Sequence, residues 1–179
     1  MKKLFMAVLG ISLAVSATAQ LNVSFRSNLT YPSDVLSNIG GYVDSAGNEY
    51  ALVGYESGLS IVDVSDPANP FIAFSVPGTN SNWREVKTWQ NYAYVTTEGC
   101  CNGLQIVNLG YLPDSIQYKY WTGNGAISGQ LETIHALHVD EAHAYLYGSN
   151  LFNGAALIVN LADPWNPDYK GHTPGSYIH

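Results

Sequence analysis

The sequence predicts an all-β fold built from repeated small antiparallel sheets, and three observations support this. Charged residues make up only 12% of the 179 residues, whereas Tyr (13) and Gly (17) are frequent. Short runs rich in Val, Ile, Tyr and Thr alternate with turns rich in Gly, Pro, Asn and Asp, as expected of strands joined by turns. Related runs then recur along the chain at a similar spacing. Because no run has the i, i+3, i+4, i+7 apolar spacing of an amphipathic helix, the sequence argues against a helical fold.

The charge balance argues against two classes of protein. The chain has 7 Lys+Arg against 14 Asp+Glu, which gives a formal net charge of -7. A nucleic-acid-binding domain carries a basic patch, so we expect no nucleic-acid partner. A hydrophobic content of 46% at low charge also excludes an intrinsically disordered chain.

The N-terminus has the pattern of a signal peptide. Lys2 and Lys3 precede an apolar stretch at residues 4–15, which is too short to span a bilayer, and a small-x-small cleavage motif ends at Ala19. Cleavage there leaves Gln20 as the first mature residue; an uncleaved anchor helix is the alternative. We therefore expect an exported protein, located outside the cell, at its surface or in a periplasm, with no transmembrane segment after cleavage.

Three stretches of the chain share the same order of features. Each has a nearly continuous apolar strand centred on Ile61, Ile106 or Ile158, followed by a turn rich in Asp, Pro or Asn. These isoleucines lie 45 and 52 residues apart. Such a period, made of short β runs, is typical of the four-stranded antiparallel blades of a β-propeller. A continuous apolar strand also fits a position covered on both faces by neighbouring sheets.

The first strand of each blade is expected to be the innermost. The positions that align in these strands are residues 38–40, 82–84, 133–135 and 177–179. In the second unit, the four strands are expected at 83–88, 92–97, 104–109 and 115–120.

The expected organisation is a signal peptide at 1–19, a lead-in segment at 20–34 and a partial propeller at 35–179. The repeats cover about 38–80, 81–131 and 132–175, and the next blade starts at 176. A propeller closes with about 4–8 blades, so three blades and the start of a fourth form an incomplete ring. We expect the missing C-terminal blades in a longer protein; a short chain that self-assembles to cover its edges is the alternative.

The apolar strands resemble the LVIVD-repeat proteins, including the choice-of-anchor B family. The repeat signature stands at residues 59–63, 104–108 and 156–160. It departs from the family pattern at Asn108 and Asn160, which replace Asp, and at Ala156, which replaces the first Leu. The resemblance implies an exported β-propeller that is usually held at a surface by a variable C-terminal anchor, and it implies no established catalytic activity.

Cys100 and Cys101 are adjacent in a loop expected between two strands. Export permits oxidation, but adjacent Cα atoms lie about 3.8 Å apart, below the usual disulfide window of about 4.4–6.8 Å. A vicinal disulfide therefore needs a strained eight-membered ring. Two interpretations are open: such a ring, or two free thiols. A metal site built on this pair alone is disfavoured, because the chain has no other Cys.

The aligned residues Arg84, His135 and His179 are expected to line the inner rim or the central channel. A ring of polar side chains can hold water, an anion or a divalent metal ion; hydrogen bonding between blades is the plainer alternative. His135 and His138 lie three apart in one expected strand, so alternation would point them to opposite faces and prevent them from chelating one ion.

The carboxylates and tryptophans allow further interpretations. Asp63, Asp66 and Asp163 belong to the repeated turn, where turn capping explains them; Ca²⁺ or another divalent cation at the blade edges is the alternative, and we expect no other cofactor. Tryptophans either fill blade interfaces or form an exposed patch, and Trp165, inside a Pro-rich turn, is expected to be exposed. The other acidic candidates at inner or loop positions, without an assigned role, are Glu85, Glu98 and Glu132.

These features favour a binding scaffold that is not an enzyme, whose partner is an extracellular protein or a glycan bound through the blade loops and the rim. The alternative is a secreted enzyme, such as a metal-assisted hydrolase or lyase, with a channel site that further blades complete. A propeller supports both functions, so the fold cannot choose between them. An enzyme should bring several titratable groups together at the rim.

Overall fold

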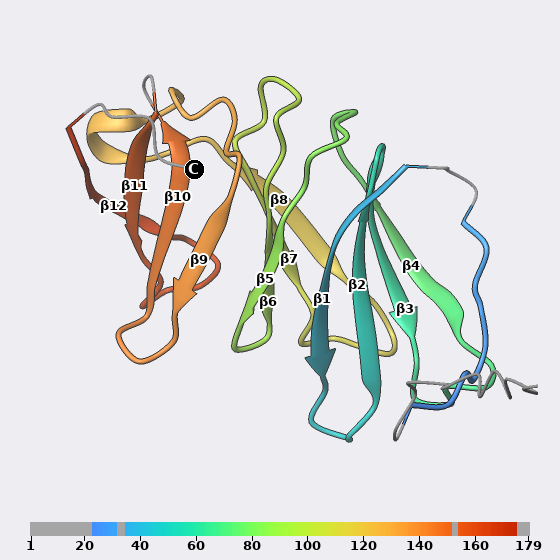
Figure 1. Cartoon of the computed structure of the whole chain (residues 1–179). Helices are drawn as coiled ribbons and strands as arrows, with labels where there is room; N and C mark the ends of the chain where they lie inside the picture. The colour runs from blue at the N-terminus through green and yellow to red at the C-terminus, as the bar shows by residue number, and fades with distance from the viewer. Residues whose placement is uncertain (1–22, 32–34, 152–153, 175–179) are drawn as a thin grey trace, which may run out of the picture.

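The computed structural model describes residues 23–31, 35–151 and 154–174. It confirms the all-β prediction, with three four-stranded antiparallel sheets standing side by side (Figure 1). Sheet 1 comprises β1 (Leu36–Val43), β2 (Glu49–Tyr55), β3 (Gly58–Asp63) and β4 (Phe71–Pro77). Sheet 2 comprises β5 (Val86–Trp89), β6 (Tyr92–Val95), β7 (Leu104–Asn108) and β8 (Gln117–Trp121). Sheet 3 comprises β9 (Leu137–Asp140), β10 (Tyr145–Leu151), β11 (Ala155–Asn160) and β12 (Asp168–His172).

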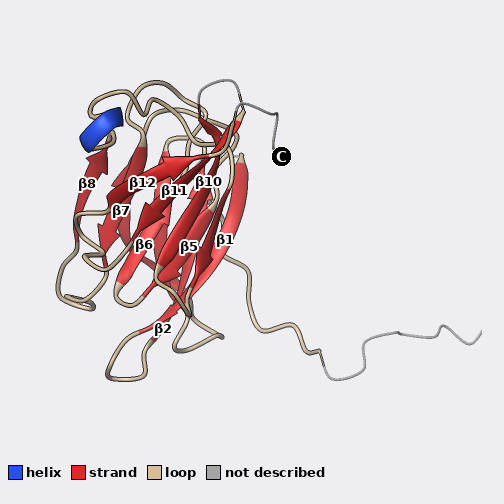
Figure 2. Ribbon diagram, turned by 90° about the vertical axis from the view of Figure 1, so that its left-hand side faces the viewer, coloured by secondary structure: helices blue, strands red, loops and turns tan. Residues whose placement is uncertain are grey.

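Helix is nearly absent from the described residues, which hold only the short 3-10 turn η1 (Gly125–Ile127) (Figure 2). Accordingly, none of their helices is long and apolar enough to cross a membrane. Three expectations fall outside the described residues: the signal peptide at 1–19, the rim residue His179 and the blade that starts at 176.

Each sheet is a simple meander, in which every strand pairs with the one before it. The first strands lie next to one another, since β1 contacts β5 and β5 contacts β9. The sheets therefore fan out from a common inner edge, as blades do (Figure 1).

Two apolar cores fill the spaces between neighbouring sheets, and sheet 2 contributes to both. Ala93, Val95 and Val107 pack with sheet 1 in one core. On the opposite face of sheet 2, Tyr94 and Ile106 pack with sheet 3 in the other. The near-continuous apolar run of β7 therefore reflects a strand covered on both faces, as the sequence predicts.

The free face of sheet 1 is covered in part by residues 23–31. Ser27 Oγ donates to the carbonyl of Pro67 at 2.8 Å, and the ring of Tyr31 lies 6.4 Å from that of Tyr55. The segment borders a cavity that is also lined by Val53 and Val62. This lead-in segment thus shields apolar side chains that no other sheet of the described residues covers.

The register of the first strands differs from the sequence alignment. Each central isoleucine pairs with a residue of the second strand, and that residue pairs in turn with one of the first strand. The first-strand residues reached in this way are Gly40, Lys87 and His138, which are therefore equivalent. Arg84 and His135 remain equivalent to each other, three residues earlier, but Gly40 does not align with them. Gly40 lies in the regular part of the ladder between β1 and β2, after the irregularity between Leu36 and Ile39, and stands level with Lys87 and His138.

The repeated turn explains why the position of Asp63 can hold Asn in the other two repeats. The side-chain oxygens of Asp63, Asn108 and Asn160 each accept a hydrogen bond from the backbone N–H two residues later, at 2.9 Å in all three cases. The turn needs an acceptor oxygen and no charge, so either residue serves.

Candidate functional site

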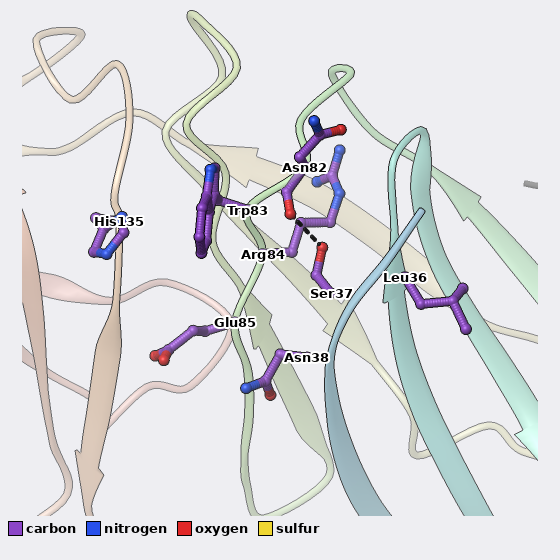
Figure 3. Close-up of a pocket in the computed structure, with 8 residues that line it drawn as sticks. All are labelled: Leu36, Ser37, Asn38, Asn82, Trp83, Arg84, Glu85 and His135. Atoms are coloured by element: carbon purple, nitrogen blue, oxygen red, sulfur yellow. Dashed lines mark hydrogen bonds between the residues drawn. The ribbon is translucent and has the colours of Figure 1, made fainter. Parts of the chain in front are cut away.

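A pocket of 410 Å³ lies at the inner edge of the array, where the chain enters the first strand of each sheet (Figure 3). We call it the rim pocket. Its lining residues are Leu36, Ser37, Asn38, Asn82, Trp83, Arg84, Glu85 and His135. All three repeats contribute to it, and it brings together two of the three predicted rim residues, Arg84 and His135.

Arg84 forms a structural link at the back of this pocket. Its side chain is only 3% exposed. Nε donates to the Tyr55 carbonyl at 2.8 Å, and Nη2 donates to the carbonyls of Glu56 and Thr79. Burial lowers the pKa of the guanidinium from its ordinary value. Because the side chain is buried and Nε and Nη2 already donate to three carbonyls, Arg84 fastens sheet 2 to the β2–β3 turn rather than offering a free cation to a ligand.

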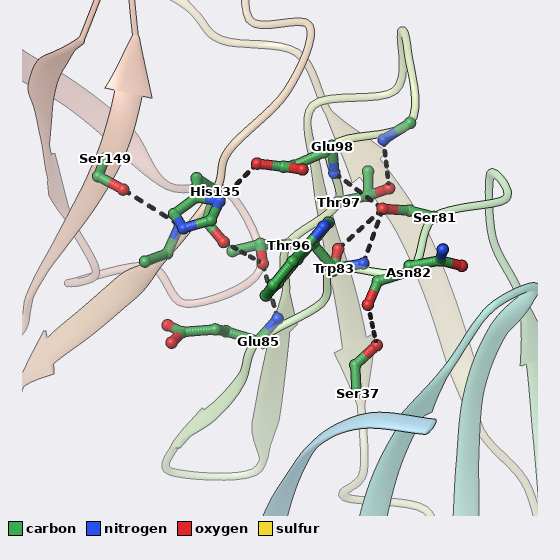
Figure 4. A network of polar contacts seen from close by, with 12 residues as sticks. Ser37, Ser81, Asn82, Trp83, Glu85, Thr96, Thr97, Glu98, His135 and Ser149 are labelled. Atoms are coloured by element: carbon green, nitrogen blue, oxygen red, sulfur yellow. Dashed lines mark hydrogen bonds and ion pairs between the residues drawn. The ribbon is translucent and has the colours of Figure 1, made fainter. Parts of the chain in front are cut away.

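His135 occupies the position equivalent to Arg84, at the boundary between sheets 2 and 3, but it makes different contacts. Its Nδ1 lies 2.5 Å from Oε1 of Glu98 in the β6–β7 turn (Figure 4). The position of Glu98 matches that of Glu56 in the β2–β3 turn. The pair remains partly exposed, with 27% of the His135 side chain accessible. His135 precedes β9 rather than lying within it, so the expected single strand holding both His135 and His138 is not formed.

Trp83 is the exposed aromatic side chain of the pocket. It is 62% exposed, and its ring centroid lies 6.0 Å from that of His135. Ser81 fixes its backbone, because Oγ donates to the Trp83 carbonyl at 2.9 Å and accepts from the Trp83 N–H at 3.1 Å. The indole therefore projects from a well-anchored segment (Figure 4).

The expectation that Trp165 is the exposed tryptophan is corrected by the structure. Trp165 is half-buried, with its ring 5.9 Å from that of Tyr92 and the ammonium of Lys119 4.7 Å from its centroid. Its turn packs on sheet 2, where Tyr94 donates from its hydroxyl to the Pro164 carbonyl at 2.9 Å. The exposure of Trp83 could have been found by alternation, since its neighbour Arg84 is directed inward.

Polar side chains from two sheets line the remaining walls. Ser37 Oγ donates to the Asn82 carbonyl at 2.9 Å and so joins the entry of β1 to that of β5. Glu85 is held in place because its Oε2 accepts from the Leu137 N–H at 2.8 Å. The Oδ1 atom of Asn38 is buried and has no hydrogen-bond partner among the described residues. The pocket therefore combines one exposed indole with two amides and one carboxylate.

Cys100 and Cys101 lie at the exposed tip of the β6–β7 turn, where the structure joins their sulfurs as a vicinal disulfide. The next residue, Asn102, donates from Nδ2 to Thr79 Oγ1 at 2.7 Å. The same turn carries Glu98, the partner of His135. The pair thus belongs to the loop that supports the rim pocket, while the oxidised ring itself stays a prediction.

One cluster in the described part of the chain brings three potential metal ligands within 4.8 Å of one another, namely Cys100, Cys101 and Glu132. A disulfide removes the thiolates that would bind an ion, so this cluster supports no metal site in the oxidised state. At the repeated turns, Asp66 and Asp163 accept hydrogen bonds from backbone N–H groups and from Asn side chains. This accounts for both aspartates by turn capping, and a divalent cation there stays a prediction.

Comparison with known proteins identifies one repeat directly. The family model of the LVIVD repeat matches residues 45–77, which span β2, β3 and β4 of sheet 1. A search of the curated proteins finds no match. The same strand pattern recurs in sheets 2 and 3, with each core isoleucine in the third strand. The chain therefore contains an LVIVD repeat at residues 45–77, and sheets 2 and 3 repeat its strand pattern.

Proposed function

We propose that this chain is an exported binding protein without catalytic activity, and that the rim pocket is its ligand site. The observation that carries the proposal is the exposed indole of Trp83, which stands on a braced segment beside polar groups from all three repeats. A large exposed aromatic ring that the fold holds in place is typical of recognition surfaces.

Two finer features belong to the same proposal. The N-terminal pattern supports export with cleavage before Gln20. The resemblance to the choice-of-anchor B group supports attachment to a surface, which would present the rim pocket to extracellular proteins or glycans. Nucleic acid is disfavoured as a ligand by the acidic charge balance.

The proposal is tested on an array that carries both glycans and peptides, probed with the mature exported protein. Trp83→Ala removes the exposed ring, and Phe71→Ala is the matched control, because Phe71 is a similarly exposed aromatic residue (55%) outside the pocket. We expect ligands that bind the wild type and Phe71→Ala but lose their signal with Trp83→Ala. Binding that is equal for all three proteins would refute the assignment of the pocket.

A secreted enzyme is the second candidate, and the His135–Glu98 pair favours it. A carboxylate that orients an imidazole is a common arrangement for a general base. The same array ligands, incubated with the protein and then examined by mass spectrometry, distinguish the two functions. Unchanged ligands support the binding protein, whereas turnover that Glu98→Gln abolishes supports the enzyme.

A further inference from the structure

We infer that the rim pocket recognises a neutral pyranose ring of an oligosaccharide, stacked on the indole of Trp83. This inference rests on the proposed function and narrows it to one ligand class. It combines three properties of the pocket: an exposed ring on an anchored backbone, hydrogen-bonding groups around it and an absence of free positive charge among its described lining residues.

The first property is the exposed indole of Trp83, on which a sugar ring can stack. One face of a pyranose presents C–H groups, which pack on the electron-rich face of an indole, while its hydroxyls point outward. Trp83 is exposed enough to receive such a face, and Ser81 holds its backbone at both the N–H and the carbonyl. The backbone that carries the indole is therefore held in the free protein, which lowers the entropy cost of binding a small ligand.

The second property is the surrounding hydrogen-bonding capacity. Asn38 and Glu85 lie below Trp83, and Asn82 lies beside it (Figure 3). Glu85 uses Oε2 on the Leu137 N–H, and no bond to its Oε1 is found in the described part of the chain. The unpaired Oδ1 of Asn38 gains a partner if rotation of the amide turns it toward a ligand hydroxyl. Amides and carboxylates of this kind match the paired donor and acceptor character of sugar hydroxyls.

Charge then separates neutral sugars from acidic ones. Glu85 lines the pocket and Glu98 lies next to it. Of the basic groups in the lining, the Arg84 guanidinium already donates to three backbone carbonyls, and the His135 imidazole is paired with Glu98. An anionic sugar would meet carboxylates without a compensating free cation, which is unfavourable. A neutral glycan avoids this repulsion.

A protein side chain fits the pocket less well than a sugar. Protein hot spots centre on well-packed apolar or aromatic pockets, but apart from Trp83 and Leu36 the lining here is polar or charged. The volume of 410 Å³ lies within the range of about 300–1,000 Å³ that is common for small-molecule sites.

The test uses the mature protein, the glycan portion of the array and isothermal titration. The titrated probes are cellotetraose, maltotetraose, mannotetraose and tetragalacturonate, together with any neutral glycan that the array selects. We expect a neutral oligosaccharide to bind the wild type and Phe71→Ala equally. Trp83→Ala should weaken that binding about tenfold or more, and Trp83→Phe, which keeps a smaller ring, should weaken it less. Urea unfolding of each variant verifies that it remains folded.

The outcomes separate this inference from the proposed function. If no neutral glycan binds, if tetragalacturonate binds best, or if Trp83→Ala binds sugar as the wild type does, the inference is overturned. Should peptides on the array still depend on Trp83, the ligand class is wrong while the rim pocket remains the binding site. If no array ligand of any class depends on Trp83, both fail together.

Discussion

Sheets 2 and 3 carry the same repeat, yet equivalent residues differ widely in burial. Tyr94 and Tyr147 both pair with the central isoleucine of their sheets, Ile106 and Ile158. Tyr94 is fully buried, whereas Tyr147 is 37% exposed. Sheet 2 lies between two neighbours, while the corresponding face of sheet 3 has no covering sheet among the described residues. Burial of a repeat position is thus decided by the adjoining repeat as much as by the residue itself.

The largest effect should come from truncating the two central isoleucines. Ile106→Ala opens a cavity in a packed core and should cost about 3 kcal/mol of unfolding free energy. Ile158→Ala, on the half-buried face, should cost about 1 kcal/mol, because less apolar area leaves water there on folding. Urea unfolding measures both.

A matched pair on the opposite face controls for local differences between the sheets. Val107 and Val159 are both fully buried, each against the preceding sheet. Val107→Ala and Val159→Ala should therefore cost similar amounts. Equal losses of unfolding free energy for Ile106→Ala and Ile158→Ala would show that the face carrying Ile158 is covered in solution, and would contradict the difference in burial between sheets 2 and 3.

The two sheet interfaces should also differ at Arg84 and His135. Arg84→Met keeps most of the buried volume but leaves three carbonyls without their donor, so we expect a loss of about 2–3 kcal/mol. His135→Ala breaks a partly exposed pair and should cost about 1 kcal/mol or less. Urea unfolding again provides the measurement, and a larger loss for His135→Ala than for Arg84→Met would reverse the assigned roles.

We expect a smaller difference in stability between substitutions on the two faces of β1. A Cβ at Gly40 would lie 3.3 Å from both Cγ1 and the carbonyl oxygen of Val86, whereas a Cβ at Gly41 would meet no described atom within 4 Å. We expect Gly40→Ala to destabilise the fold by about 1 kcal/mol through crowding. Gly41→Ala should be neutral or slightly stabilising, because Ala loses less backbone entropy than Gly on folding. Thermal unfolding of the two variants checks this, and equal transitions would contradict the placement of β5 against β1.

The sequence predicts the sheets better than it predicts the site. The spacing of Ile61, Ile106 and Ile158 is enough to indicate three sheets, because a strand covered on both faces must be continuously apolar. The alignment of Gly40 with Arg84 and His135 fails because strand pairing places Gly40 level with Lys87 and His138, and residue counting does not show that pairing. Trp165 looks exposed because its turn is Pro-rich, but that turn packs on sheet 2. Both errors arise from contacts between elements, which a single sequence does not record.

The smallest expected effect concerns pH and the repeated turns of sheets 1 and 3. The side chain of Asn69 holds the pKa of Asp66 below its ordinary value, and Asn166 does the same for Asp163. A carboxyl whose pKa is lower in the folded than in the unfolded state stabilises the fold above the unfolded pKa, near about 4. That stabilisation is lost as the pH falls through the folded pKa.

Asp66→Asn and Asp163→Asn each keep an acceptor oxygen for the turn while removing the titrating group, just as Asn108 and Asn160 serve in their own turns. Each variant should be less stable than the wild type at pH 7, because it lacks the ionised group and the second oxygen that accepts from Asn69 or Asn166. It should then lose less stability than the wild type as the solution is acidified below about pH 4. Asp163 also lies near Lys119, whose charge contributes to its lowered pKa, so the Asp163→Asn difference should shrink more in added salt. Urea unfolding at pH 7 and at acid pH, with and without salt, measures all three effects. An acid loss in either variant as steep as that of the wild type would mean that the carboxyl of its turn does not contribute to the pH dependence.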